Sequence, residues 1–144
     1  FGTINDMSKI IVHSDGGARG NPGPAAIGVV IAKEGGEVLE ELSETIGEST
    51  NNIAEYTAVL RGLHALIALF GEKTTELDID WRLDSELVVK QLAGEYKVKN
   101  PGLRSLFEEI RDLRARFPKL SLRHVRREEN KEADRLVNEA LDRG

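Results

Sequence analysis

The chain has 144 residues, 40% of them hydrophobic, a formal net charge of −5 and no cysteine. This length suits one well-buried domain and is short for two. The missing cysteine excludes disulfides, zinc–thiolate sites and thiol nucleophiles, and no uninterrupted apolar run reaches the length of a membrane span, so we expect a cytoplasmic protein without a membrane partner. The acidic balance means that any nucleic acid must be held by a local basic surface.

The N-terminal residues are set apart by the position of the only methionine, Met7. We interpret residues 1–6 as a leader or an expression remnant and exclude them from the fold prediction. Residues 7–144 are expected to form a single domain.

Three strands are predicted in the first third of the chain. Residues 9–14 form an apolar run, and a glycine- and proline-rich connection that ends at Pro24 leads to a second apolar run at residues 25–33. Residues 37–46 follow after Glu34-Gly35-Gly36, which predicts a hairpin with the second run. Apolar and polar residues alternate only weakly in this third strand, as expected for a strand at the edge of a sheet.

Helices and strands alternate in the rest of the chain. Apolar residues recur every three or four positions over residues 52–70, which predicts a helix with Thr50 or Asn51 as its N-cap and Gly71 at its end. The remaining predicted elements, in chain order, are a strand at 77–83, a short helix at 86–92, a helix from Pro101 to about 117, a strand at 120–125 and a last helix capped by Asn130. The strand–helix–strand crossovers predict an α/β fold with a five-stranded mixed sheet and helices on both faces.

Four acidic residues occupy positions that are unusual for surface residues. Asp15 and Asp84 each follow an apolar strand, and Glu55 and Asp134 border apolar lines near the start of their helices. Ligands of open α/β sheets gather at the carboxyl ends of the parallel strands, so these acids can meet at one place. Taken singly, an Asp or Glu is far more often a solvated residue or a helix cap than a ligand, and it is their joint placement that favours a site.

Carboxylates gathered in one place repel each other unless cations occupy the site between them. With no cysteine and no clustered histidine, an all-oxygen ligand set favours a hard ion, Mg²⁺ first and Mn²⁺ second. Two such ions about 4 Å apart are the arrangement that activates water and stabilises a leaving oxygen in phosphodiester hydrolysis. The residues themselves therefore predict metal-dependent phosphoryl chemistry.

The motifs around these acids occur in the order and at the spacing of a known family, and the chain resembles type 1 ribonuclease H. The matching segments are Asp15-Gly16-Gly17, residues 21–25, residues 50–55, Asp84-Ser85 and residues 130–134. The resemblance implies the three-layer ribonuclease H-like fold and an endonuclease that cuts the RNA strand of RNA/DNA hybrids, leaving 5′-phosphate and 3′-hydroxyl ends. It also implies that Asp15, Glu55, Asp84 and Asp134 are catalytic residues that bind the metal ions.

The resemblance extends to residues that contact the substrate. Asn21, Asn51 and Asn52 correspond to positions that contact the hybrid, and short amides suit the ribose 2′-hydroxyls of a minor groove. Thr50 and Ser85 correspond to positions near phosphate, with Thr50 on the DNA strand. For Asn51 and Asn52 simple helix capping is the alternative interpretation.

Two departures from the family pattern affect the prediction. Many members carry a catalytic histidine in the loop before the last helix, but the short connection at residues 125–130 has none. His124 lies within the alternating strand and is predicted to pack structurally, so Arg127 is the candidate for holding phosphate or assisting product release, with pairing to Glu128 or Glu129 as the alternative. The basic protrusion of many members is also missing, which predicts weaker binding of the substrate.

Two alternative functions remain open at this stage. The chain could be a non-catalytic module that binds hybrids or duplexes, although such a module has no reason to concentrate negative charge where a phosphate must approach. It could also be another metal nuclease of the same fold, such as a resolvase- or integrase-like enzyme. In each case we expect a monomer with no obligate protein partner.

Overall fold

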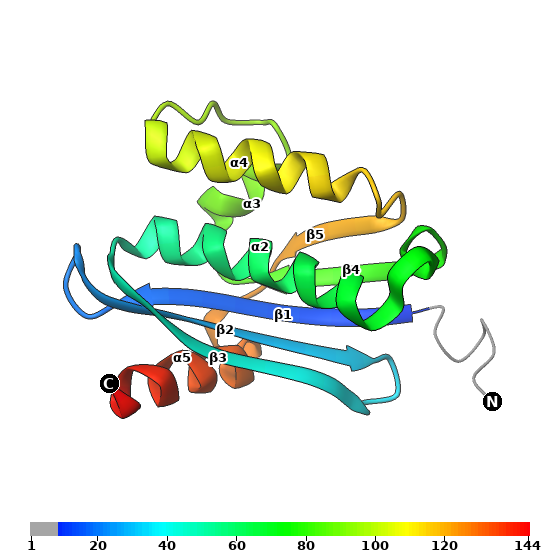
Figure 1. The fold of residues 1–144 in the computed structure, drawn as a ribbon, viewed down its shortest axis with the longest axis horizontal. Helices are drawn as coiled ribbons and strands as arrows, with labels where there is room; N and C mark the ends of the chain where they lie inside the picture. Colours follow the sequence, from blue (N-terminus) through cyan, green and yellow to red (C-terminus); the bar gives the residue numbers. More distant parts are fainter. Residues whose placement is uncertain (1–8) are drawn as a thin grey trace.

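The computed structural model describes residues 9–144, which form one mixed sheet with helices on both of its faces (Figure 1). The expected leader at residues 1–6 lies outside this range. The strands are β1 (Lys9–Ala18), β2 (Gly23–Lys33), β3 (Val38–Ser49), β4 (Asp78–Leu83) and β5 (Leu120–His124). The helices are α2 (Asn51–Phe70), α3 (Glu86–Leu92), α4 (Pro101–Arg114) and α5 (Lys131–Arg143), with 3₁₀ turns at Gly71–Glu76 and Arg127–Glu129.

The sheet has the strand order β3-β2-β1-β4-β5. The first three strands are antiparallel neighbours, whereas β4 is parallel to both β1 and β5. The parallel pairs are the ones whose connections contain a helix, because a parallel neighbour cannot be reached by a tight turn. The predicted five-stranded mixed sheet and the edge position of the third strand are both confirmed.

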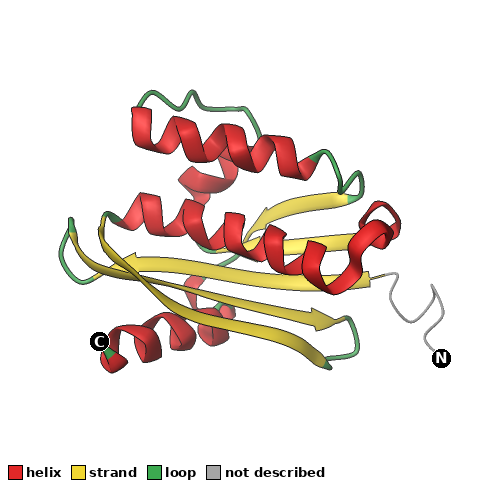
Figure 2. Cartoon of the chain, in the orientation of Figure 1, coloured by secondary structure: helices red, strands yellow, loops and turns green. Residues whose placement is uncertain are grey.

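Three layers result from the placement of the helices (Figure 2). Helices α2, α3 and α4 lie on one face of the sheet and α5 lies on the other. The main core fills the space under α2, where Trp81 of β4 is fully buried against Gly62. A Cβ atom at Gly62 would lie 2.6 Å from the indole ring, so only glycine lets the helix approach the tryptophan this closely.

Helix α2 owes its composition to this buried position. Together with the turn after it, the helix is long and apolar enough to cross a membrane, judged by its length and its mean hydropathy of 1.4 alone. Half of the apolar window is buried inside the fold, as in the central helix of a packed core. Thr50 caps its first turn by accepting a 3.2 Å hydrogen bond from the Ile53 amide, which decides the predicted choice between Thr50 and Asn51.

Several boundaries differ from the sequence prediction. Strand β1 continues to Ala18, because its antiparallel pairing with β2 runs on after the parallel pairing with β4 has ended. Asp15 is therefore inside a strand, opposite Gly28, and does not end one as predicted. Helix α4 ends at Arg114, three residues before the predicted end near the buried Phe117.

Candidate active site

The four predicted acids meet at one hollow of about 440 Å³ on the surface. Carboxylate oxygens of Asp15, Glu55 and Asp84 all lie within 4.8 Å of one another. Asp134 lines the same hollow from α5, next to Asp15. Segments separated by up to 119 positions in the chain thus place four carboxylates together.

Asp15 and Glu55 are brought together by a close approach of α2 to β1. A Cβ atom at Gly16 would lie 2.2 Å from the Ala54 carbonyl carbon, so a glycine is required there. The Gly16 amide donates a 3.1 Å hydrogen bond to Glu55 Oε1, which fixes the orientation of that carboxylate. Both acids are buried, at 8% and 9% exposure, whereas Asp84 is only partly covered where β4 ends.

Asp134 is positioned by the anchoring of α5 on the other face of the sheet. The helix comes so close to β2 that a Cβ atom at Gly28 would lie 2.2 Å from the Ala133 carbonyl oxygen. Asn130 Nδ2 donates a 2.9 Å hydrogen bond to the Ser14 carbonyl, one residue before Asp15. Asn130 precedes α5 as predicted, but the prediction that its side chain caps the helix is wrong. The buried side chain instead holds the helix against β1.

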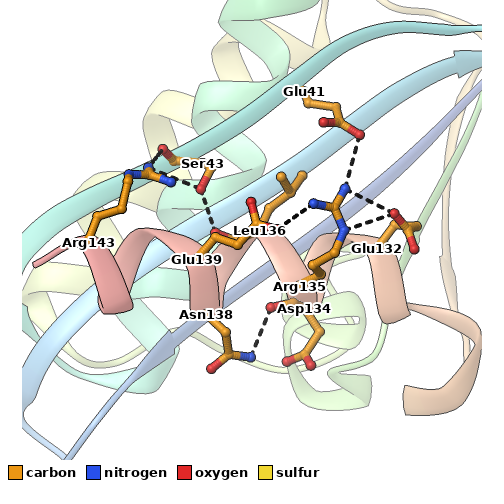
Figure 3. Close-up of polar contacts among 9 residues, drawn as sticks. All are labelled: Glu41, Ser43, Glu132, Asp134, Arg135, Leu136, Asn138, Glu139 and Arg143. Carbon is orange, nitrogen blue, oxygen red and sulfur yellow. Dashed lines mark hydrogen bonds and ion pairs between the residues drawn. The ribbon is translucent and has the colours of Figure 1, made fainter.

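Polar contacts along α5 attach it to the edge strand β3 (Figure 3). Arg135 forms ion pairs with Glu132 and Glu139 of its own helix and with Glu41 of β3. Further along, Ser43 Oγ donates a 2.6 Å hydrogen bond to the Leu136 carbonyl. The outer face of the helix is therefore held as well as the apolar face, on which Val137 and Ala140 pack against Ala26.

The electrostatics of the hollow oppose ionisation of the carboxyl groups of Asp15, Glu55 and Asp84. Burial, followed by the charges of Asp84 and Asp134 and a hydrogen bond with Asp134, raises the pKa of Asp15 to about 8. Burial and the charge of Asp15 hold the pKa of Glu55 well above its ordinary value, and burial raises the pKa of Asp84 as well. A divalent cation would relieve this repulsion, and the all-oxygen donor set fits a hard ion.

Two basic candidates lie close to Asp84. Arg127 lines the hollow, and its charge opposes the effect of burial on the pKa of Asp84. His124 also acts on that pKa, and it is exposed at the end of β5. The prediction that His124 packs structurally is therefore wrong, because the strand ends there and leaves the ring at the surface beside the site.

A second groove, which shares Asn51 with the first, is lined by amide and hydroxyl side chains together with the apolar side chains of Ile53 and Leu103. Its polar lining consists of the predicted substrate contacts Asn21, Thr50, Asn51 and Asn52, together with Asn100. Asn100 does cap α4, with its Oδ1 accepting bonds of 2.8 and 3.2 Å from the amides of Gly102 and Leu103. Its place at the groove results from the packing of α4 on α2, and no pattern in the local sequence indicates it.

Two of the predicted contacts at this groove, Asn51 and Asn21, use their side-chain oxygen atoms to accept backbone hydrogen bonds. Asn51 Oδ1 accepts a 2.8 Å bond from the Ala18 amide, and Asn21 Oδ1 accepts a 3.0 Å bond from the Asn51 amide. Asn51 is thus a bridge from α2 to the end of β1 and not the helix cap. Within residues 9–144 neither Nδ2 group donates a hydrogen bond, so both remain donors for a ligand.

Ser85 is the predicted substrate contact that the structure places outside both hollows. Its hydroxyl accepts a 3.3 Å hydrogen bond from the Val88 amide and caps α3. Because it directly follows Asp84, it still lies beside the acidic cluster.

Comparisons with known proteins show which family this chain belongs to. A family model described as reverse transcriptase-like matches residues 13–140. A ribonuclease HI of Halobacterium salinarum is 44% identical over 134 residues, which cover 93% of the chain. A solved structure of LC11-RNase H1, isolated from compost, is 52% identical with a TM-score of 0.90, covering 95% of this chain and 98% of that one. The chain belongs to the type 1 ribonuclease H family.

The solved structures of this ribonuclease H family include one with a nucleic acid. A crystal structure of LC11-RNase H1 in complex with an RNA/DNA hybrid is 50% identical, with a TM-score of 0.88 and coverage of 93% of this chain and 97% of that one. A bifunctional protein of Mycobacterium tuberculosis is 39% identical over 93% of the chain. The chain spans 36% of the length of that mycobacterial protein and 65% of the length of the Halobacterium ribonuclease HI.

Proposed function

We propose that the protein is an endoribonuclease that cuts the RNA strand of RNA/DNA hybrids and leaves 5′-phosphate and 3′-hydroxyl ends. The observation that carries the proposal is the convergence of Asp15, Glu55 and Asp84 within 4.8 Å at one hollow, beside the amide-lined groove. Four acids with no function in binding would only repel a nucleic acid, so a module that merely binds hybrids is disfavoured.

The carboxylates of this hollow would hold two divalent ions, Mg²⁺ or Mn²⁺. Asp15, Glu55, Asp84 and Asp134 supply only oxygen donors, as these hard ions prefer. When bound, such ions make water a stronger nucleophile and stabilise the leaving oxygen. The buried carboxyl groups of Asp15 and Glu55 are kept in place by the strand and the helix before any ion arrives, so little reorganisation is needed.

The remaining residues of the site bind and orient the hybrid. Asn21, Asn51 and Asn52 present amide donors at the groove, where ribose 2′-hydroxyl oxygens and base edges of a minor groove are accessible as acceptors. Thr50 lies in the same groove, near where a phosphate of the DNA strand would pass, and Ser85 lies beside Asp84. Arg127 is placed to hold a phosphate of the RNA strand or to help the product leave.

A monomeric state and a cytoplasmic location belong to the same proposal. The cysteine-free composition supports the location. Among residues 9–144, the large exposed apolar side chains are those of Val38, Leu69, Leu87 and Tyr96. They come from four separate elements or loops, which supports a monomer, because stable interfaces need a contiguous apolar core.

The experiment is to incubate the protein with a hybrid whose RNA strand is labelled, in Mg²⁺, Mn²⁺ or EDTA, and to map the ends of the products. We expect metal-dependent internal cuts in the RNA with 5′-phosphate and 3′-hydroxyl ends. Cleavage in EDTA, or 2′,3′-cyclic phosphate ends, would contradict the proposed mechanism, because such ends form without an activated water.

A further inference from the structure

Arg19 is a basic residue at the hollow to which neither the motifs nor the proposed function assigns a role. It directly follows β1, and its backbone is fixed by a 2.8 Å hydrogen bond from its amide to the Pro24 carbonyl. Its side chain is half exposed and lines the same hollow as the four carboxylates. Among residues 9–144, Arg19 and Arg127 are the two basic residues that line it.

The two arginines lie at different parts of the hollow. Arg127 acts on Asp84, at the end of β4, whereas Arg19 reaches the C-terminal half of α5. There Arg19 Nη2 donates a 2.8 Å bond to Asp142 Oδ1 and a longer bond of 3.4 Å to Asn138 Oδ1. A phosphate backbone that crosses the four acids would thus pass one guanidinium near Asp84 and another near α5.

The contact between Arg19 and Asp142 is of a kind that a phosphate can displace. Both side chains are well exposed, at 50% and 68%, and exposed ion pairs contribute little to stability. A guanidinium binds phosphate through paired, charge-assisted hydrogen bonds, which are stronger than its single close bond to Asp142.

We propose that Arg19 is a second phosphate contact of this site and that it stays paired with Asp142 until a phosphate of the hybrid displaces Asp142. The proposal rests on the proposed function, because it names a further contact for the same substrate. It assigns opposite effects to the two partners: loss of Arg19 weakens binding of the hybrid, and loss of the Asp142 charge strengthens it.

The test measures binding of a fluorescent RNA/DNA hybrid over a range of KCl concentrations, with Asp15→Asn as the parent protein so that the hybrid is not cut. Arg19→Ala is expected to weaken binding about fivefold and to reduce the slope of log Kd against log[KCl] by about 0.7 to 0.9, as for one lost phosphate contact. Arg19→Lys should retain most of the slope. Arg111→Ala and Asp112→Asn on α4, an exposed pair with a 3.4 Å contact, are the matched controls and should change neither quantity.

The double variant separates release of Arg19 from a general charge effect. Asp142→Asn should tighten binding about twofold because Arg19 is freed, and the gain should disappear in the Arg19→Ala background. An unchanged affinity and slope for Arg19→Ala, or a full Asp142→Asn effect in its absence, would overturn the proposal. Thermal melts check that each variant folds. If Arg19→Ala does not fold, the hybrid affinities of Arg19→Lys and Asp142→Asn test the proposal.

Failure of this proposal and failure of the proposed function give different results. If the parent binds the hybrid and Arg19→Ala binds it equally well, only the role of Arg19 is rejected. If the parent does not bind the hybrid at all, the proposed function is rejected and the role of Arg19 with it.

Discussion

Asp15 is the residue on which the electrostatics of the site depend most. It is buried within β1, opposite Gly28, with three other carboxyl groups around it. Its pKa of about 8 means that the metal-free protein keeps a proton at this position over most of the neutral range. Without a cation the fold therefore favours the protonated form of Asp15, which is the expected compromise between stability and function at such a site.

Replacing Asp15 tests this compromise directly. Asp15→Asn is expected to lower hybrid cleavage by more than about 100-fold, because loss of a direct ligand should exceed the effect of losing an outer-shell partner. In EDTA the Asp15→Asn variant should melt at the same temperature as the wild-type protein or at a slightly higher one, since carboxylate repulsion is relieved. Full activity of the variant would reject Asp15 as a ligand.

The raised pKa values also predict how stability depends on pH in the absence of metal. Protonation of Asp15 and Glu55 stabilises the folded state fully below the ordinary carboxyl pKa of about 4, and this contribution is lost as the pH rises through the folded-state value, about 8 for Asp15. The free energy of unfolding in EDTA, measured with urea between these values, should therefore fall with rising pH.

The variant Asp15→Asn serves as the control for this dependence and should show a flatter curve. Mg²⁺ should restore more stability near pH 8 than at acidic pH, because it competes with protons for the same carboxylates. A wild-type curve that rises with pH in EDTA would contradict the raised pKa values.

Arg127 and His124 can be separated by substitution. Arg127→Ala is expected to lower turnover about tenfold. The loss should be smaller than for a fully enclosed hydrogen-bond donor, because water screens the charge of an exposed cation at a phosphate. Arg126→Ala is the neighbouring control, since Arg126 is exposed, contacts Glu129 at 3.9 Å and does not line the hollow. A larger loss in His124→Ala than in Arg127→Ala would transfer the proposed role to the histidine.

At the scale of the elements, the site depends on two close approaches of helices to the sheet. Helix α2 meets β1 at Gly16, and α5 meets β2 at Gly28, each with backbone atoms where a side chain would otherwise be. These contacts place Glu55 and Asp134 on either side of Asp15. The positions of the acids are therefore set by glycines that carry no chemistry themselves.

Gly28→Ala tests the second approach. The added methyl group would meet the Ala133 carbonyl at 2.2 Å, and we expect a loss of about 2 kcal/mol in the free energy of unfolding, as is typical of overpacking. Displacement of α5 should also reduce cleavage, through Asp134. Gly35→Ala, in the β2–β3 turn with no atom within 4 Å, is the control and should change stability little; equal stability of the two variants would contradict the packing argument.

The order and type of the elements could be predicted from the sequence because each has its own periodic pattern. The acids could be predicted for the same reason: Asp84 follows a clear strand, and Glu55 borders the apolar line of α2. The extension of β1 past Asp15 could not be predicted, since it depends on pairing with β2. The use of Asn130 to hold β1, and the place of Asn100 at the groove, likewise depend on contacts between distant segments.

At the scale of the whole molecule, the charge distribution sets what the protein can bind. The net charge is −5, and the connection from α3 to α4 at residues 93–100 has no room for a basic helix. Under the proposed function, affinity for the hybrid would come from the few cations and amides near the acidic hollow, so that binding and catalysis would share one small surface.

The central claim is that this surface cuts the RNA strand of RNA/DNA hybrids in a metal-dependent reaction. The most direct measurement compares the rates at which the protein cleaves an RNA/DNA hybrid, a duplex RNA and a duplex DNA of the same sequence, in Mg²⁺ and in EDTA. The account predicts rapid cleavage of the RNA strand of the hybrid in Mg²⁺, none in EDTA, and no cleavage of duplex DNA. Binding of the hybrid without metal-dependent cleavage, or cleavage of duplex DNA at a comparable rate, would contradict it.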